Sequence, residues 1–143
     1  MPASDEWCTP EWLATLLGHF DLDPCSHLLS HIKYQRSYTL PMDGLTNGWL
    51  GSVFCNPPYS NPLPWCERLR DHDGPWCALL KLDPSTRWWA ALMQANPVVA
   101  PFKKRIRFEG AGNYTANFPS VLVYSGWRPS PELQQHLWMR SWT

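Results

Sequence analysis

The sequence predicts an α/β fold in which helices cover both faces of a mostly parallel sheet, and three observations support this. Short apolar segments typical of strands alternate several times with segments of helical periodicity. One of them, CALLKL, is typical of a buried strand. The 15 prolines are spread along the chain and indicate element boundaries. Because 143 residues suit one domain with a sizeable core, we expect a single domain over 1–143, with a flexible arm over 1–6.

The N-terminal part is expected to contain one helix and one strand. TPEWLATLLGHF predicts a helix, because Thr9 can cap it, Pro10 suits its first position and Glu11 favours its positive end. Residues 20–22 are expected to form a strand that ends in a polar turn at Asp23-Pro24. SHLLSHIKYQRSYTL indicates a short helix followed by an irregular connection, and PMDGLTNGW indicates turns.

The rest of the chain repeats the alternation. GSVFC predicts a strand, and SNPLPWCERLRDH predicts a helix with Trp65 and Leu69 facing inward. PSTRWWAALMQA predicts a helix capped by Asp83 or Ser85. The remaining expected elements are strands in PVVAPF, RIRF and PSVLVYSG and a closing helix in SPELQQHLWMRSW.

Polar turns lie at or near the expected strand ends. They are Asp23-Pro24, Asp43-Gly44 and Asn56-Pro57. In open α/β sheets, ligands bind just beyond the carboxyl ends of the strands. We therefore expect these turns to meet at one edge of the sheet and to form a ligand site.

The segment SVFCNPPYSNP ends a strand abruptly at Asn56, because the prolines after it remove backbone donors. An aromatic amine such as N6 of adenine is a poor nucleophile, so it needs acceptors aimed at its N–H bonds to stabilise the charge that develops on attack. The Asn56 side-chain oxygen and the Pro57 carbonyl, fixed in direction by Pro58, can serve as these acceptors. Tyr59 offers a ring for stacking a flipped-out base. The same residues fit an ordinary loop, and the tetrapeptide alone leaves both interpretations open.

Composition limits the possible functions. The formal net charge is zero, so nucleic-acid contacts must come from a local patch. KKRIR is the best candidate, although a solvated surface is the alternative. No apolar segment is long enough to cross a membrane, and the odd number of cysteines indicates reduced thiols. We expect a cytoplasmic protein, and no spacing of histidines and cysteines indicates a metal site.

Four motifs together resemble those of a known family: WCTP, FDLDPCS, DGL and NPPY. The resemblance extends from EWCTPEWL to PSVLVY, and the family is the phage-type, Dam-like DNA N6-adenine methyltransferases, which use S-adenosylmethionine. It implies a compact Rossmann-like three-layer methyltransferase fold. It also implies a phage protein that acts in the bacterial host cytoplasm and protects DNA from restriction.

The resemblance implies a role for each motif. The catalytic motif is Asn56, Pro57, Pro58 and Tyr59. The implied cofactor-binding residues are Trp7, Thr9, Pro10, Asp23, Pro24, Cys25, Ser26, Asp43, Gly44, Leu45 and Asn56. Asp23 is preferred to Asp21 for the cofactor ribose because Asp23 lies at the strand end. One departure from the family pattern is that Cys25-Ser26 stands where most methyltransferases carry a Gly-x-Gly.

The implied reaction is transfer of a methyl group to an adenine flipped out of double-stranded DNA, with no metal. The expected DNA contacts are Lys103, Lys104, Arg105, Arg107, Asn61 and Arg87, together with a loop over 110–118. The protein is expected to be a monomer or a homodimer. Two alternatives stay open, which are methylation of RNA adenine or a protein glutamine amide, and a catalytically weak nucleic-acid-binding module derived from this fold.

Overall fold

A computed structural model gives the structure of residues 8–25, 33–37, 41–108 and 116–139, and describes only the backbone of 33–37 and 41–43. Its elements, in chain order, are α1 (Glu11–Leu17), β1 (His19–Asp23), β2 (Lys33–Ser37), α2 (Pro41–Thr46), β3 (Val53–Cys55), α3 (Leu63–Asp71), β4 (Trp76–Lys81), α4 (Arg87–Met93), β5 (Val98–Pro101), β6 (Ser120–Ser125) and α5 (Pro131–Gln134). Strands and helices alternate through most of this order, as predicted.

The described strands form one six-stranded sheet in the order β2-β1-β3-β4-β6-β5. Neighbours among β2, β1, β3 and β4 are parallel, whereas β6 is antiparallel to both β4 and β5. β5 therefore runs in the same direction as β4, and of the described strands β6 alone runs the opposite way. The expected mostly parallel sheet is confirmed, with an antiparallel strand near one edge, as occurs in other α/β folds.

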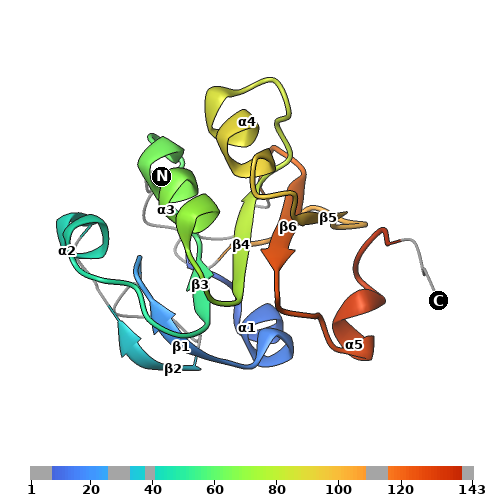
Figure 1. Cartoon of the computed structure of the whole chain (residues 1–143). Coiled ribbons are helices and arrows are strands. Elements are labelled where there is room, and N and C mark those ends of the chain that lie inside the picture. Colours follow the sequence, from blue (N-terminus) through green and yellow to red (C-terminus); the bar gives the residue numbers. More distant parts are fainter. Residues whose placement is uncertain (1–7, 26–32, 38–40, 109–115, 140–143) are drawn as a thin grey trace.

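Helices cover both faces of this sheet (Figure 1). On one face, α1 and α5 pack against the strands through an apolar cluster that includes Leu13 and Leu79. On the other face, α3 and α4 pack through a second cluster that includes Trp65 and Ala78. The neighbours Ala78 and Leu79 belong to different clusters because successive side chains of a strand point to opposite faces. The molecule therefore has three layers.

Two predicted helix caps are wrong. Pro10, not Thr9, precedes the first residue of α1, and no side chain caps this helix. The Thr9 hydroxyl is instead directed at Asn56. In α4 the cap is Thr86, whose hydroxyl accepts a hydrogen bond from the backbone N–H of Trp89 at 3.3 Å.

Residues 33–37 form a strand where an irregular connection was expected. This strand, β2, lies at the edge of the sheet and pairs in parallel with β1. An edge strand needs no apolar pattern, because backbone pairing on one side is enough to form it. The expected short helix at the start of this stretch falls on residues outside the described part of the chain.

Three further expectations differ from the structure. PMDGLT forms the helix α2 rather than turns. RIRF is not a strand, although Ile106 and Phe108 are buried between exposed arginines as its alternation predicted. The closing helix α5 spans four residues, and the chain then pairs back with the end of β5 through a bridge between Phe102 and Leu137.

The direction of the strands decides which loops can meet. β1, β3, β4 and β5 run the same way, so their carboxyl ends lie at one edge of the sheet, which we call the carboxyl edge. β1 ends at Asp23, and the residues that follow β3, β4 and β5 are Asn56, Leu82 and Phe102. The expected meeting of the Asp23-Pro24 and Asn56-Pro57 turns at one edge is therefore a consequence of the topology.

Candidate active site

The sheet order changes direction between β1 and β3. From β1 the chain continues to β2 on one side, whereas β3 and then β4 lie on the other side. In open α/β sheets this reversal leaves a crevice at the carboxyl ends of the two strands, where ligands bind. Asp23 ends β1 and Asn56 follows β3, so both flank this position.

The side chain of Asn56 is held between the sheet and α1. Its amide nitrogen donates to the Thr9 hydroxyl at 3.4 Å, and the exposed fractions of the two residues are 9% and 3%. Because the amide nitrogen faces Thr9, the amide oxygen is not used in this contact. The structure thus brings together two of the predicted site residues and leaves the Asn56 oxygen as an acceptor.

The ring of Tyr59 is supported by other aromatic rings. It stands edge-on to Phe118 and Phe108, with ring centroids 5.5 Å and 6.3 Å away. Its hydroxyl donates to the carbonyl of Leu79 at 3.4 Å. Burial raises the pKa of Tyr59 well above its ordinary value, so the phenol stays neutral.

Asp23 is a buried carboxyl group at the end of β1. It accepts a hydrogen bond from the backbone N–H of Cys25 at 3.2 Å. Burial raises its pKa to about 7, and the Cys25 bond opposes this shift. Asp21, in contrast, exchanges hydrogen bonds with Ser52 at 3.0 Å and 2.9 Å, which ties β1 to the start of β3. Asp23 therefore lies at the carboxyl edge, whereas the Asp21 carboxylate is engaged in the contact between β1 and β3.

The DGL segment meets the Asp23-Pro24 turn. A Cβ on Gly44 would collide with the Pro24 carbonyl oxygen and lie 2.6 Å from the Trp65 ring, so only glycine fits this contact. Leu45 is partly buried against the second apolar cluster. The placement of DGL beside the first strand end was expected. Trp7, Ser26 and the side chain of Asp43 lie outside what the structure describes.

Cys25 occupies the position where the expected Gly-x-Gly is absent, and it is buried. Burial raises the pKa of the nearby Cys55 thiol well above its ordinary value, and Cys25 and Asp23 add to this shift. Thiols in this state are protonated and behave as small apolar groups. Cys55 therefore acts as a small apolar group beside this edge of the site.

The basic segment begins at the same sheet edge as Asn56. Phe102 follows β5, and the next three residues, Lys103, Lys104 and Arg105, are exposed. Phe108, the residue after the segment, packs its ring edge-on against Tyr59. Asn61 and Arg87 are also exposed and follow β3 and β4. All the proposed DNA contacts outside the 110–118 loop, Arg107 included, therefore share one edge. Of that loop, the structure describes 116–118.

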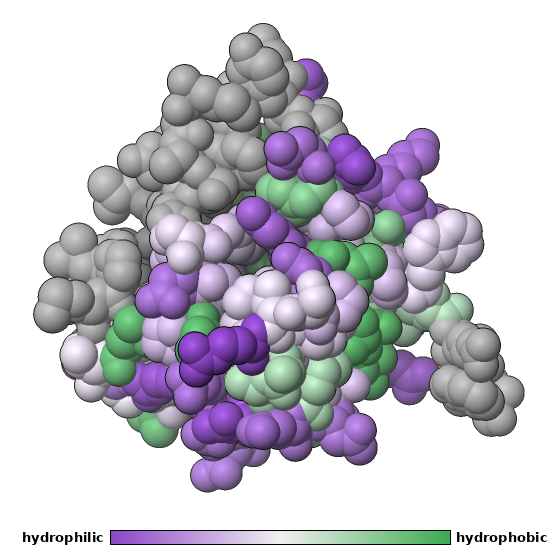
Figure 2. Space-filling view, turned by 90° about the horizontal axis from the view of Figure 1, so that it is seen from above, coloured by the Kyte–Doolittle hydropathy of each residue, from purple (hydrophilic) through white to green (hydrophobic). Residues whose placement is uncertain are grey.

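Sequence reasoning missed Lys81. It ends β4, and its ammonium group lies 4.6 Å from the centroid of the Phe118 ring and 5.5 Å from that of Tyr59. The available signal was its position: a cation two residues beyond the buried Leu79 on the same face of a strand. Figure 2 views the molecule from above Figure 1, toward the end where β4 leads into α4, and shows hydrophilic residues bordering small hydrophobic areas.

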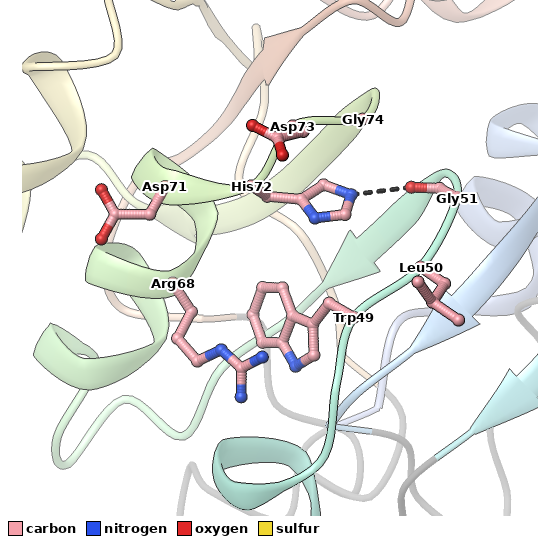
Figure 3. Close-up of a pocket in the computed structure, with 8 residues that line it drawn as sticks. All are labelled: Trp49, Leu50, Gly51, Arg68, Asp71, His72, Asp73 and Gly74. Carbon is pink, nitrogen blue, oxygen red and sulfur yellow. Dashed lines mark hydrogen bonds between the residues drawn. The ribbon is translucent and has the colours of Figure 1, made fainter.

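A pocket of about 410 Å³ lies at the opposite sheet edge, before the starts of β3 and β4 (Figure 3). Arg68 stacks over Trp49 at 4.7 Å and donates to the carbonyls of Leu45 and Asn47 at 2.8 Å and 2.9 Å. His72 contacts the Gly51 carbonyl at 2.7 Å. These groups hold the connection between α2 and β3 in place. This pocket is separated from Asn56 by the length of the strands.

The part of the chain described here contains no helix of the length and apolarity that a membrane span requires. Within the same residues, no three histidine, cysteine or acidic side chains gather as ligands for a metal.

Comparison with known proteins gives a match that covers most of the chain. A family model described as DNA N-6-adenine-methyltransferase (Dam) matches residues 1–125. A protein of Haemophilus phage HP1 (strain HP1c1), named DNA N-6-adenine-methyltransferase, is 34% identical over an alignment of 134 positions that covers 83% of this chain and 77% of the relative.

Proposed function

Because the chain belongs to the DNA N-6-adenine-methyltransferase (Dam) family, we propose that it transfers a methyl group to N6 of adenine in double-stranded DNA. The observation that carries this proposal is the Asn56 side chain, which Thr9 orients at the end of β3. Its amide oxygen is the acceptor that an aromatic amine needs. The sheet reverses its order at the same place, which is where α/β folds of this type bind ligands.

The chain's own residues supply acceptors for the amine. The Asn56 side-chain oxygen and the Pro57 carbonyl accept hydrogen bonds from the two N–H groups of the adenine amine. These bonds draw the nitrogen lone pair out of conjugation with the adenine ring. They stabilise the positive charge that develops on nitrogen as the new bond forms. Asn56 and Pro57 are both buried, so these interactions act where little water competes. The proton that the amine loses afterwards passes to solvent, so no strong base is required.

S-adenosylmethionine supplies the activated methyl group when it is bound. The residues at the switch point fit this cofactor: Asp23 is a buried carboxyl group that can accept from ribose hydroxyls, and Gly44 leaves no side chain where α2 meets Pro24. Thr9 and Pro10 border Asn56 on the α1 side. We assign Trp7, Ser26 and Asp43 to the same pocket from their motifs. We propose that the α/β sheet with helices on both faces is a Rossmann-like methyltransferase fold and that residues 1–143 form a single domain; the order of the strands and helices supports this.

The Tyr59 ring is proposed to stack on the flipped-out adenine. Phe108 and Phe118 contact it edge-on and thereby fix its orientation. Base stacking on an aromatic ring contributes about 1–3 kcal/mol. Lys103, Lys104, Arg105 and Arg107, with Asn61 and Arg87, are proposed to contact the DNA backbone at the carboxyl edge.

We further propose that the protein is phage-encoded, works in the host cytoplasm as a monomer or homodimer, and protects DNA from restriction. The phage origin of the relative supports this. DNA from expressing cells should then resist restriction endonucleases that are blocked by N6-methyladenine.

The decisive experiment is mass spectrometry of DNA from cells that express the protein. The wild type should produce N6-methyladenine, and Asn56→Ala should abolish the signal because one acceptor is removed. Gln94→Ala, which truncates an exposed amide between α4 and the start of β5 at the opposite sheet edge, is the matched control and should retain the signal. Thermal unfolding and circular dichroism show whether Asn56→Ala is folded. A wild type without methylated DNA, or an active Asn56→Ala variant, would contradict the proposal.

A further inference from the structure

Lys81 is a cation placed beside the catalytic motif, and the reaction as described above does not use it. As the last residue of β4, it lies on the same strand face as Leu79, whose carbonyl accepts from the Tyr59 hydroxyl. Its ammonium group approaches the Phe118 and Tyr59 rings at 4.6 Å and 5.5 Å. Attraction to ring faces holds a cation with about 0.5–2 kcal/mol, depending on exposure.

This charge has no acidic partner in the described structure. Among the residues that the structure describes, no carboxylate pairs with Lys81. The side chain is partly buried, so water only partly solvates the ammonium group. A partly buried cation that is held by rings rather than by a carboxylate is suited to an anionic ligand.

The strand register shows where this anion would lie. Cys55 pairs with Ala78, so Asn56 is level with Leu79 and Lys81 stands two residues further out along the strand direction. That is about 6–7 Å at the rise of a strand. When the adenine amine is at Asn56 and its ring is on Tyr59, the sugar and phosphate extend outward, toward the level of Lys81.

A direct role at the amine is disfavoured by charge. Methyl transfer places positive charge on the adenine nitrogen, and a neighbouring ammonium group would raise the energy of that transition state. A phosphate, in contrast, carries a negative charge that the Lys81 ammonium group attracts both before and during the reaction.

We propose that Lys81 binds a backbone phosphate of the flipped-out nucleotide. The inference rests on the proposed function, because it takes the adenine position from Asn56 and Tyr59. The ring contacts keep the ammonium group at the rim of the site while DNA is absent.

The test compares Lys81→Met, which keeps the apolar stem, with the wild type, Lys81→Arg and the control Arg128→Met. Arg128 is exposed and follows β6, whose end lies at the opposite sheet edge. For Lys81→Met, the slope of log affinity for DNA against log salt should shrink in magnitude by about 0.7–0.9, as expected when one phosphate is no longer neutralised. KM for DNA should rise while kcat at saturating DNA and cofactor affinity stay the same. Lys81→Arg should keep the slope, and Arg128→Met should match the wild type.

An unchanged salt slope with a lower kcat would overturn the inference, because it would mean that Lys81 acts only by packing on Tyr59. If Lys81→Met does not fold, Lys81→Gln takes its place with the same expectations. A wild type that neither binds nor methylates DNA overturns the proposed function itself. A wild type that does both, beside an unaffected Lys81→Met variant, overturns only the role of Lys81.

Discussion

The carboxyl group of Asp23 is 3% exposed, and its charge depends on pH in the neutral range. Loss of hydration favours the protonated form, and a hydrogen bond from the Cys25 N–H is too weak to reverse this. The same group is proposed to accept hydrogen bonds from ribose hydroxyls, which the ionised form does best. Through Asp23, a rise in pH is therefore expected to lower the stability of the protein and to strengthen cofactor binding.

Stability should fall as pH rises through the range set by Asp23. Folding raises its pKa from 3.8 to about 7, so the folded protein binds more protons than the unfolded chain between these values. The neutral carboxyl group contributes its full stabilisation, on the order of 4 kcal/mol, below pH 3.8, and this contribution is lost as the pH rises to about 7. Asp23→Asn should remove most of this dependence in denaturant unfolding across the same range, whereas the exposed Asp73→Asn should retain it.

Cofactor affinity gives the opposite trend for the same residue. Calorimetry should show tighter binding of S-adenosylmethionine as pH rises through about 7 in the wild type. Asp23→Asn should bind more weakly and without this trend. A wild-type affinity that is flat across this range would mean that Asp23 does not contact the cofactor.

Among the elements, α2 shows most clearly how packing overrides local sequence preference. PMDGLT contains proline and glycine, and a pattern-based interpretation favours turns. The segment is nevertheless helical, because Gly44 lets it pack directly on Pro24 and Trp65. Arg68 then binds carbonyl groups at and after its end. These contacts are tertiary, so they could not be read from the segment itself.

Gly44→Ala should weaken this contact. The added methyl group meets the Pro24 carbonyl, which is backbone and cannot turn aside, so α2 must shift. Overpacking of this kind lowers the free energy of unfolding by about 1–3 kcal/mol. Gly48→Ala is the matched control, because a Cβ there meets nothing within 4 Å. Thermal unfolding compares the two, and equal destabilisation of both variants would contradict the proposed close contact.

The sequence was sufficient where chemistry and periodicity agree. Apolar patterns predicted the strands in GSVFC and CALLKL, which the structure places at Val53–Cys55 and Trp76–Lys81, and the helix α3. The prolines after Asn56 predicted that β3 ends just before it. Failures came from competition between partners. Thr9 suits a helix cap by its local sequence, but its hydroxyl accepts a hydrogen bond from the side chain of Asn56, which is distant in the sequence. The Tyr59 and Phe118 rings beside Lys81 come from other segments of the chain, so a strand pattern alone does not reveal this contact.

At the scale of the whole molecule, the direction of the strands concentrates function at one edge. The formal net charge is zero, yet Lys103, Lys104 and Arg105 emerge from β5 at the carboxyl edge that also holds Asn56. A neutral protein gains little from long-range attraction to DNA. Its affinity must therefore come from this local group of cations and be sensitive to salt.

The double variant Lys104→Gln/Arg105→Gln tests this distribution of charge. Both side chains are exposed, and Lys103 is left in place because its ammonium group packs 5.1 Å from the Trp138 ring. DNA affinity should fall, and the slope of log affinity against log salt should shrink by about 0.9 for each phosphate that is no longer neutralised. Cofactor affinity and kcat at saturating DNA should not change, since neither residue reaches Asn56. Arg128→Gln, at the other edge, should leave the slope unaltered. An equal effect of Arg128→Gln would show that general charge, rather than the carboxyl edge, determines DNA binding.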